Sequence, residues 1–145
     1  RSVSCVIIRC FGMPLYAHAK KQTSVMLSST GAESYAMSEA GKKILPVRGF
    51  LLEIGLPRIT IPLYADNAAA ITISNNHFTL SKMSRHMAVR HLYIRELVKR
   101  GFFKLVWVPS VLNLADIGTK SLDECRFAEL SEAVLGWSNA KTTKE

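Results

Sequence analysis

The chain opens with two runs of apolar and β-branched residues around a turn. The first run, residues 3–11 (VSCVIIRCF), ends at Gly12, and Pro14 follows shortly after. Gly and Pro are the usual residues of tight turns, so residues 14–19 are expected to return as an antiparallel partner strand. Residues 20–22 (KKQ) are polar and are expected to form the exposed end of this second strand. The pattern therefore predicts a β-hairpin.

Apolar residues then recur at intervals of three and four, which predicts a helix with one apolar stripe. The stripe consists of Ala36, Ala40, Ile44, Val47, Leu51 and Ile54. Thr30 and Glu33 have the spacing of a capping box, in which each side chain bonds to an unpaired backbone N–H at the helix start. Gly55 ends the pattern. Pro46 lies inside it and is expected to kink the helix or divide it in two.

The rest of the chain alternates between the two periodicities. Strands are predicted at residues 59–64 and 102–108, helices at 68–74, 86–100 and about 122–135, and a polar loop at 75–84. Within the second of these helices, Val89, Tyr93 and Leu97 fall on one side, and Gly101 ends it. The order β-β-α-β-α-α-β-α predicts an α/β fold, a mixed β-sheet with helices packed on it.

Composition narrows the class of protein. A chain of 145 residues is expected to form one domain, here residues 1–137, followed by a polar C-terminal tail at 138–145. No apolar run reaches the length of a membrane span, so no membrane partner is expected. Cys5, Cys10 and Cys125 contain no C-x-x-C pair, which favours an intracellular location, cytoplasmic or nuclear, and argues against a structural zinc site.

The charge balance indicates the kind of partner. The chain has 19 Lys and Arg against 11 Asp and Glu, for a formal net charge of +8. Such an excess favours polyanions, chiefly nucleic acid, because binding releases counterions from the phosphates. Charge alone leaves open a basic protein that is merely soluble.

Three carboxylates stand where elements of the predicted sheet begin and end. Glu33 opens the long helix, Asp66 directly follows a strand, and Asp116 lies beyond another strand. If the three converge, they suit a hard cation such as Mg²⁺ or Mn²⁺. Two such ions can activate a water and stabilise the leaving oxygen in phosphoryl transfer. Spacing alone equally allows Glu33 to be the capping partner of Thr30, Asp66 a helix N-cap, and Asp116 a turn cap.

Four ordered segments resemble the ribonuclease H domain of copia-type retrotransposon Pol polyproteins, over nearly the whole chain. They are KKQTSVMLSSTGAE (20–33), LYADN (63–67), RHMAVRHLYIRE (85–96), and VWVP (106–109) with NLADIGTK (113–120). The resemblance implies a ribonuclease H-like fold. It also implies that Glu33, Asp66 and Asp116 are three of four acidic ligands of Mg²⁺ (or Mn²⁺), used to hydrolyse the RNA strand of RNA–DNA hybrids.

The same resemblance makes several basic residues candidates for contacts with nucleic-acid phosphates. These are Lys82, Arg85, Arg90, Arg95 and Lys104. Helical spacing spreads the three arginines over more than one face, and solvated surface charge is an equal alternative for each residue.

The sequence also departs from the family pattern. The chain begins at the segment similar to the family's second strand, and no Asp precedes Asp66. We therefore expect a sheet that lacks its first strand, with two bare edges filled by an upstream polyprotein segment, by a second copy in a homodimer, or by re-pairing of the sheet. Pro62 lies within a predicted strand, and Gly118 stands where the family has Phe.

Two functional hypotheses follow. The first is a ribonuclease H-type endonuclease whose activity is weak or lost in this chain, as in a decaying or domesticated copy. The second is a non-catalytic nucleic-acid-binding or self-associating module derived from such a domain.

Overall fold

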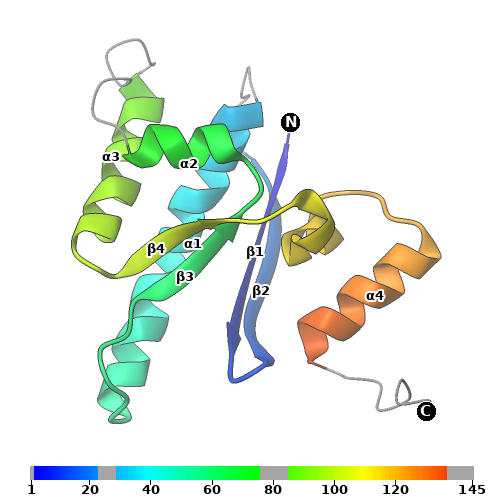
Figure 1. Cartoon of the computed structure of the whole chain (residues 1–145), viewed down its shortest axis with the longest axis horizontal. Coiled ribbons are helices and arrows are strands. Elements are labelled where there is room, and N and C mark those ends of the chain that lie inside the picture. The colour runs from blue at the N-terminus through cyan, green and yellow to red at the C-terminus, as the bar shows by residue number, and fades with distance from the viewer. Residues whose placement is uncertain (1, 23–28, 76–84, 137–145) are drawn as a thin grey trace.

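The computed structural model describes residues 2–22, 29–75 and 85–136. The helices and strands are β1 (Val3–Cys10), β2 (Met13–Lys21), α1 (Ser29–Glu53), β3 (Ile61–Ala65), α2 (Ala68–Asn75), α3 (Arg85–Lys99), β4 (Phe103–Trp107) and α4 (Glu124–Leu135) (Figure 1). Two short 3₁₀ helices, η2 (Ser110–Leu112) and η3 (Leu114–Gly118), connect β4 to α4. The mixed α/β class and the order of the main elements are as predicted. The predicted loop at 75–84 lies almost entirely outside the described residues, as does the predicted tail.

The strands form two separate pairs. β1 and β2 make the predicted antiparallel hairpin, with Val3 opposite Lys21, and its turn places Phe11 and Gly12 at positive φ. β3 and β4 are parallel, with Ile61 opposite Phe103. Within the described residues no ladder joins the two pairs, so the single mixed sheet expected from the sequence is present as two two-stranded sheets. Re-pairing of the sheet, one of the three expected ways to fill the bare edges, is therefore not observed among the strands that the structure describes.

Helix α1 packs against both β1 and β3. It is one helix of 25 residues, and Pro46, which is exposed, does not divide it as one reading of the sequence expected. The predicted capping box is wrong, because Ser29 and Thr30 already belong to the helix. Ile54 is also misplaced in the predicted apolar stripe, since it lies beyond the helix and is 57% exposed.

The core lies between α1, α3 and the β3–β4 pair. Its buried members are Ile8, Met37, Ile44, Ala65, Ala70, Ile94, Leu97 and Phe103. Helix α3 buries His91, Ile94 and Leu97, whereas Val89 is 60% exposed, so the predicted apolar side of this helix is only partly right. Gly41 lets α3 approach α1 closely: a Cβ atom there would lie 3.0 Å from Leu97 Cδ1.

Gln22 and Gly118 hold the N-terminal hairpin to the rest of the molecule. Gln22, expected at an exposed strand end, is buried, and its Nε2 donates to Ser4 Oγ (2.7 Å) and to the Ala32 carbonyl (2.9 Å). Gly118 lets η3 approach β1, because a Cβ atom there would lie 2.6 Å from Cys5 Sγ. The close approach fixes η3, and the residues it presents, against β1.

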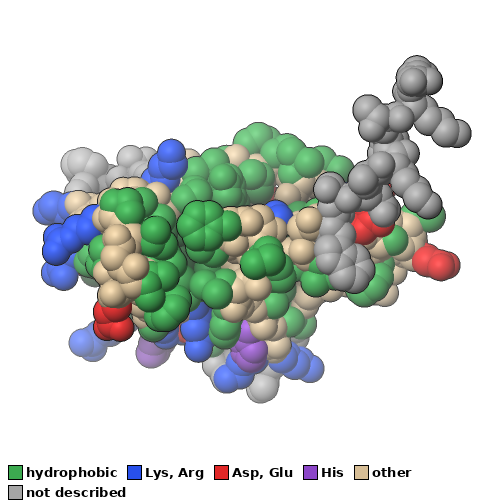
Figure 2. Space-filling view, turned by 90° about the horizontal axis from the view of Figure 1, so that it is seen from below, with side chains coloured by type: hydrophobic (Ala, Val, Ile, Leu, Met, Phe, Trp, Pro, Cys, Tyr) green, Lys and Arg blue, Asp and Glu red, His purple; other side chains and the backbone are tan. Residues whose placement is uncertain are grey.

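Part of the surface is apolar. The exposed large hydrophobic side chains include Phe11, Met13, Phe50, Tyr64, Trp107, Val111, Leu112 and Phe127. Figure 2 shows apolar side chains gathered over much of the face seen from below, with Lys, Arg and His toward its margins. Among the described helices, none is long and apolar enough to cross a membrane.

Candidate functional site

The structure brings Glu33, Asp66 and Asp116 to one cavity. Glu33 lies in the first turns of α1, Asp66 directly follows β3, and Asp116 lies in η3. All three line a cavity of about 140 Å³, whose other walls include residues 3–5 at the start of β1. Glu33 and Asp66 also border a neighbouring cavity of about 470 Å³. We call the smaller one the acidic cavity.

Asp66 is held at the end of β3 by contacts with the segment that follows β4. Ser110 Oγ donates a hydrogen bond to Asp66 Oδ2 (3.0 Å), and Trp107 Nε1 donates to the Asp66 carbonyl (3.2 Å). The N-cap of α2 is Asn67, whose Oδ1 accepts from the backbone N–H of Ala70 (3.0 Å). The reading of Asp66 as the N-cap of this helix is therefore wrong, and its carboxylate is left for the cavity.

Asp116 is buried, with 8% of its surface exposed. Its Oδ2 accepts a hydrogen bond from Lys120 Nζ at 2.7 Å. The cap of this turn is Asn113, whose side chain accepts from the backbone N–H of Ala115. Asp116 is therefore not the turn cap that the sequence allowed; it is a buried carboxylate facing a single ammonium group.

The pKa of Glu33 reflects both its burial and the charges around it. Burial, the largest cause, and the negative charges of Asp66 and Asp116 together raise its pKa to about 7, while Lys120 acts in the opposite direction. A pKa near 7 means that Glu33 carries a proton for much of the time at neutral pH. Negative charge in the cavity is thus only partly compensated, which is the condition that favours binding of a cation.

Carboxylate oxygens are the ligands preferred by Mg²⁺ and Mn²⁺, so the donor chemistry of the acidic cavity fits such an ion. Within the part of the chain that the structure describes, however, no three His, Cys, Asp or Glu side chains lie close enough together to hold a metal ion. Lys120 Nζ stands at Asp116 in the position of a counter-ion. Binding a divalent cation therefore requires the carboxylates to move closer and Lys120 to move away from Asp116.

The basic residues proposed from the sequence separate into different places. Arg85 and Arg90 border a groove between α1 and α3. Lys104 is exposed on β4, and Arg95 lies close enough to His91 to lower its pKa together with burial, the larger cause. Lys82 lies outside the described residues.

The sequence reasoning missed two partners of Arg90. Its guanidinium stacks on the Tyr35 ring, 4.0 Å from the centroid, and its Nη1 donates to Ser38 Oγ at 2.8 Å. Both partners are on α1, 52 or more residues away in sequence, so only the packing of α3 on α1 reveals them. No local pattern in the sequence links Arg90 to these two residues.

The fold and the acidic cavity define a mixed α/β domain with three carboxylates gathered from separate elements. The chain is homologous to a short region of copia-type retrotransposon Pol polyproteins. It is 34% identical over 118 residues to the retrovirus-related Pol polyprotein from transposon TNT 1-94 of Nicotiana tabacum, a match that covers 81% of this chain and 9% of the relative.

Two Arabidopsis thaliana proteins show the same relationship. The retrovirus-related Pol polyproteins from transposons RE1 and RE2 are 31% identical over 123 residues and 30% identical over 122 residues, and each match covers 83% of this chain and 8% of the relative. The chain thus spans less than a tenth of the length of these relatives. No protein-family profile matches the chain. No solved structure matches it either.

Proposed function

We propose that this chain is a ribonuclease H-like domain of a retrotransposon Pol polyprotein that hydrolyses the RNA strand of RNA–DNA hybrids with Mg²⁺ or Mn²⁺. Homology to a short region of Pol polyproteins limits the choice to the activities of such polyproteins. The net charge of +8 favours a nucleic-acid substrate.

One observation supports this activity above all: Glu33, Asp66 and Asp116 line the same cavity, where burial and then the charges of the two aspartates raise the pKa of Glu33 to about 7. The capping roles that the sequence allowed for Asp66 and Asp116 are filled by other residues, since Asn67 caps α2 and Asn113 caps η3. Asp116 is buried and Glu33 and Asp66 are partly buried, and carboxylates gathered out of water are costly without a counter-charge, so a bound cation is the simplest reason for their placement.

Each side chain has a definite part in the proposed reaction. Asp66 and Asp116 would hold the cation through their carboxylate oxygens, and Ser110 orients Asp66 by its hydrogen bond. Glu33, whose raised pKa lets it carry a proton near neutral pH, would supply a third ligand in its ionised form. The bound ions supply the chemistry of activating a water and stabilising the leaving 3′ oxygen.

We expect this activity to be weak in the chain by itself. Lys120 competes with a cation at Asp116, and the described carboxylates are not yet at coordination distance. A fourth carboxylate, implied by the family resemblance, would have to come from another segment, because no Asp in this chain precedes Asp66.

We further propose that this segment is a strand that pairs with β1 or β3. The acidic cavity lies between the start of β1 and the end of β3, so a strand placed there would bring a side chain to it. Ile61 N–H donates to Phe102 across the β3–β4 ladder, which turns the next backbone nitrogen, that of Pro62, toward the open edge of β3. Since proline has no N–H, β1 offers the better edge.

The strand could come from an upstream polyprotein segment or from a second copy of this chain. Light scattering distinguishes these sources. A dimer that forms with rising concentration supports the second copy, whereas a monomer at every concentration supports the polyprotein segment.

The activity is tested by cleavage of an end-labelled RNA–DNA hybrid in Mg²⁺ and in Mn²⁺. We expect slow cleavage that Asp66→Asn abolishes. Asp123→Asn is the matched control, because Asp123 caps α4 away from the cavity and Asn caps helices equally well. Cleavage that survives Asp66→Asn would indicate a contaminating nuclease and contradict the proposal. Hybrid binding without any cleavage would favour the non-catalytic module.

A further inference from the structure

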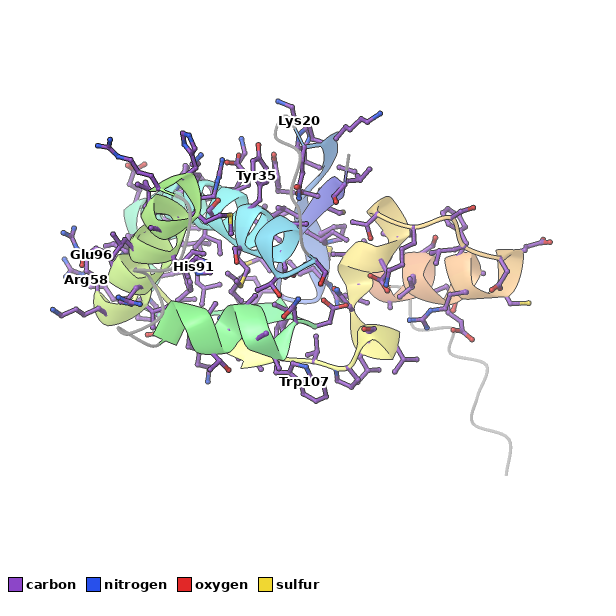
Figure 3. All side chains as sticks on the ribbon, turned by 90° about the horizontal axis from the view of Figure 1, so that it is seen from above. Lys20, Tyr35, Arg58, His91, Glu96 and Trp107 are labelled. Atoms are coloured by element: carbon purple, nitrogen blue, oxygen red, sulfur yellow. The ribbon has the colours of Figure 1, made fainter. Side chains whose placement is uncertain are left out.

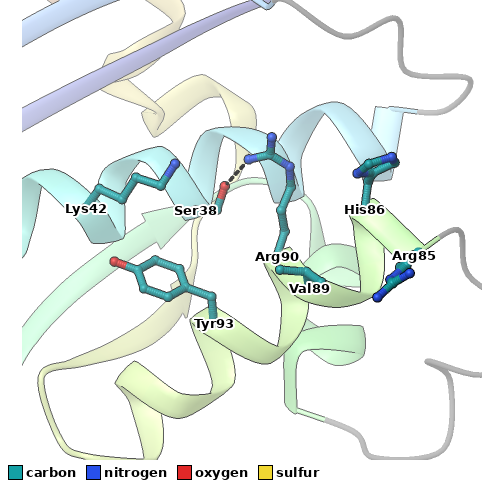
Figure 4. Close-up of a pocket in the computed structure, with 7 residues that line it drawn as sticks. All are labelled: Ser38, Lys42, Arg85, His86, Val89, Arg90 and Tyr93. Atoms are coloured by element: carbon teal, nitrogen blue, oxygen red, sulfur yellow. Dashed lines mark hydrogen bonds between the residues drawn. The ribbon is translucent and has the colours of Figure 1, made fainter.

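A groove with cationic walls lies between α1 and α3 (Figure 4). Its volume is about 660 Å³, within the roughly 300–1,000 Å³ of ligand-binding clefts. It is lined by Ser38 and Lys42 from α1 and by Arg85, His86, Arg90 and Tyr93 from α3. None of these residues is among those that line the acidic cavity. We call it the basic groove.

Arg90 is fixed in the wall of the basic groove. Its guanidinium stacks on Tyr35, donates to Ser38 Oγ, and lies 3.8 Å from Glu39 Oε1, and only 23% of the side chain is exposed. A guanidinium has five N–H donors in a planar fork, so these contacts leave it the capacity to bind phosphate oxygens. Because the side chain is already ordered, binding an anion costs less conformational entropy than it would at a free surface arginine.

The first turn of α3 adds to the positive potential. Arg85 and His86 stand there, and the turn contains no acidic residue. The N-terminus of a helix carries a partial positive charge, so cations are unfavourable and anions favourable at this position. An anion in the groove would offset both the helix dipole and the Arg85 charge. Lys42, on the facing wall, lies toward the other end of the groove, where its Nζ is 2.7 Å from Glu39 Oε1, so it extends the cationic lining along the groove.

The cationic surface continues beyond the groove, past Tyr35. A second cavity, of about 120 Å³, is lined by Tyr35 and Lys43 of α1 and by His18, Lys20 and Lys21 of β2. Figure 3 shows Tyr35 between Lys20 and helix α3, on the side of the molecule opposite Trp107. Among the described residues that line the two cavities, one has a carboxylate, and that residue is Glu39. A row of cations across three elements suits an extended polyanion better than a single small anion.

We propose that the basic groove and its extension over Tyr35 bind the phosphodiester backbone of a nucleic-acid strand. The basic groove shares no lining residue with the acidic cavity, whereas its extension borders that cavity at Ser4. Lys42 follows Glu33 by nine residues on α1, which places it about 13 Å further along the helix and about half a turn around it. Binding at this face therefore needs neither the metal nor the carboxylates, and it does not depend on the proposed catalytic function.

The test is binding of a fluorescein-labelled RNA–DNA hybrid, and of single-stranded DNA of the same length, by anisotropy in EDTA. Arg85→Gln with Arg90→Gln is expected to weaken binding of at least one probe at least 10-fold at moderate salt. Loss of two phosphate contacts should also reduce the slope of log K against log salt by about 1.4–1.8. Lys42→Gln with Arg85→Gln spares the contacts of Arg90 with α1, so it gives the same result without risk to folding.

Arg58→Gln with Lys99→Gln is the matched control, because it removes the same charge from exposed positions outside both cavities. The control should bind within 2-fold of the parent chain. Equal losses in the groove and control variants would mean that net charge alone attracts the probes and would overturn the proposal. Displacement of the labelled strand by inorganic phosphate at low millimolar concentration would also overturn the proposal. The site would then bind a free anion as well as it binds the phosphodiester backbone.

Discussion

Lys120 Nζ lies 2.7 Å from Asp116 Oδ2, four residues away along η3 and the turn that follows. The two side chains differ in exposure, since 12% of the Asp116 side chain and 53% of the Lys120 side chain are accessible. The ammonium can therefore leave into water, whereas the carboxylate stays buried. This asymmetry makes Lys120 a replaceable counter-ion at the acidic cavity.

Replacing Lys120 should strengthen cation binding. Lys120→Gln removes the competing charge from Asp116, and we expect the affinity for Mg²⁺ to rise about 3- to 10-fold, the effect of roughly 1 kcal/mol from a partly screened charge. Isothermal titration with Mg²⁺ measures the change. Lys99→Gln, which removes the same charge from an exposed position on α3, should leave the affinity unchanged. An equal or lower affinity in Lys120→Gln would show that the ammonium does not compete with the metal.

Glu33 should make stability depend on pH. Its pKa is raised from 4.5 to about 7 in the folded chain, so the folded state binds this proton more tightly than the unfolded state. Its contribution is therefore fully present below pH 4.5 and is lost as pH rises through 7, by roughly 1–3 kcal/mol. Denaturant unfolding of Glu33→Gln should lack this loss, making the variant more stable than the parent at pH 8. Identical pH profiles for the two chains would contradict the raised pKa.

A divalent cation should reverse the pH dependence at Glu33. The ion favours the ionised carboxylate, so binding near pH 7 releases a proton and the affinity for Mg²⁺ increases between pH 6 and pH 8. Thermal unfolding with and without Mg²⁺ at the two pH values measures this effect. We expect greater stabilisation at pH 8, and equal stabilisation at both values would mean that Glu33 is not a ligand.

Asp66 and Asn67 should respond oppositely to substitution. Asn67 caps α2, so Asn67→Ala should cost about 0.5–2 kcal/mol of stability. Asp66→Asn removes a negative charge that raises the pKa of Glu33, so it should leave stability unchanged or increase it. Denaturant unfolding at pH 7.5 compares the two variants. A larger loss for Asp66→Asn than for Asn67→Ala would assign Asp66 a structural role.

Gly118→Ala should destabilise the contact between η3 and β1. The new Cβ atom would lie 2.6 Å from Cys5 Sγ and 3.1 Å from Ala19 Cβ, and such overpacking costs about 1–3 kcal/mol. Adding Cys5→Ala removes the sulfur atom and should recover part of the loss, which a double-mutant cycle measures as a coupling energy. Additive effects of the two substitutions would show that the sulfur does not limit the approach of η3.

Local patterns predicted the elements of this chain well. The hairpin turn at Gly12, the end of α3 at Gly101 and the strand at residues 102–108 all depend on neighbouring residues, and the structure has them close to where the pattern places them. The clearest exception is Pro46, which sequence rules make a helix breaker. Tertiary contacts of α1 with β1, β3 and α3 keep that helix continuous.

Features set by packing between distant segments were not predictable. Gln22 looks like a surface residue, yet its buried amide bonds to Ser4 and Ala32. Gly41 and Gly118, of which the sequence marked only Gly118 as a departure from the family pattern, are positions of close approach between elements. For the candidate site, the sequence named Glu33, Asp66 and Asp116, but Lys120, which lies against Asp116, was identified only from the structure.

Titration of Mn²⁺ followed by electron paramagnetic resonance tests most directly whether the three carboxylates form one cation site. We predict one class of site whose affinity falls at least 10-fold in each of Glu33→Gln, Asp66→Asn and Asp116→Asn and is unchanged in Asp123→Asn, since Asp123 caps α4 outside the cavity. Equal affinity in all four variants would place the ion elsewhere and contradict the metal site on which the nuclease proposal depends.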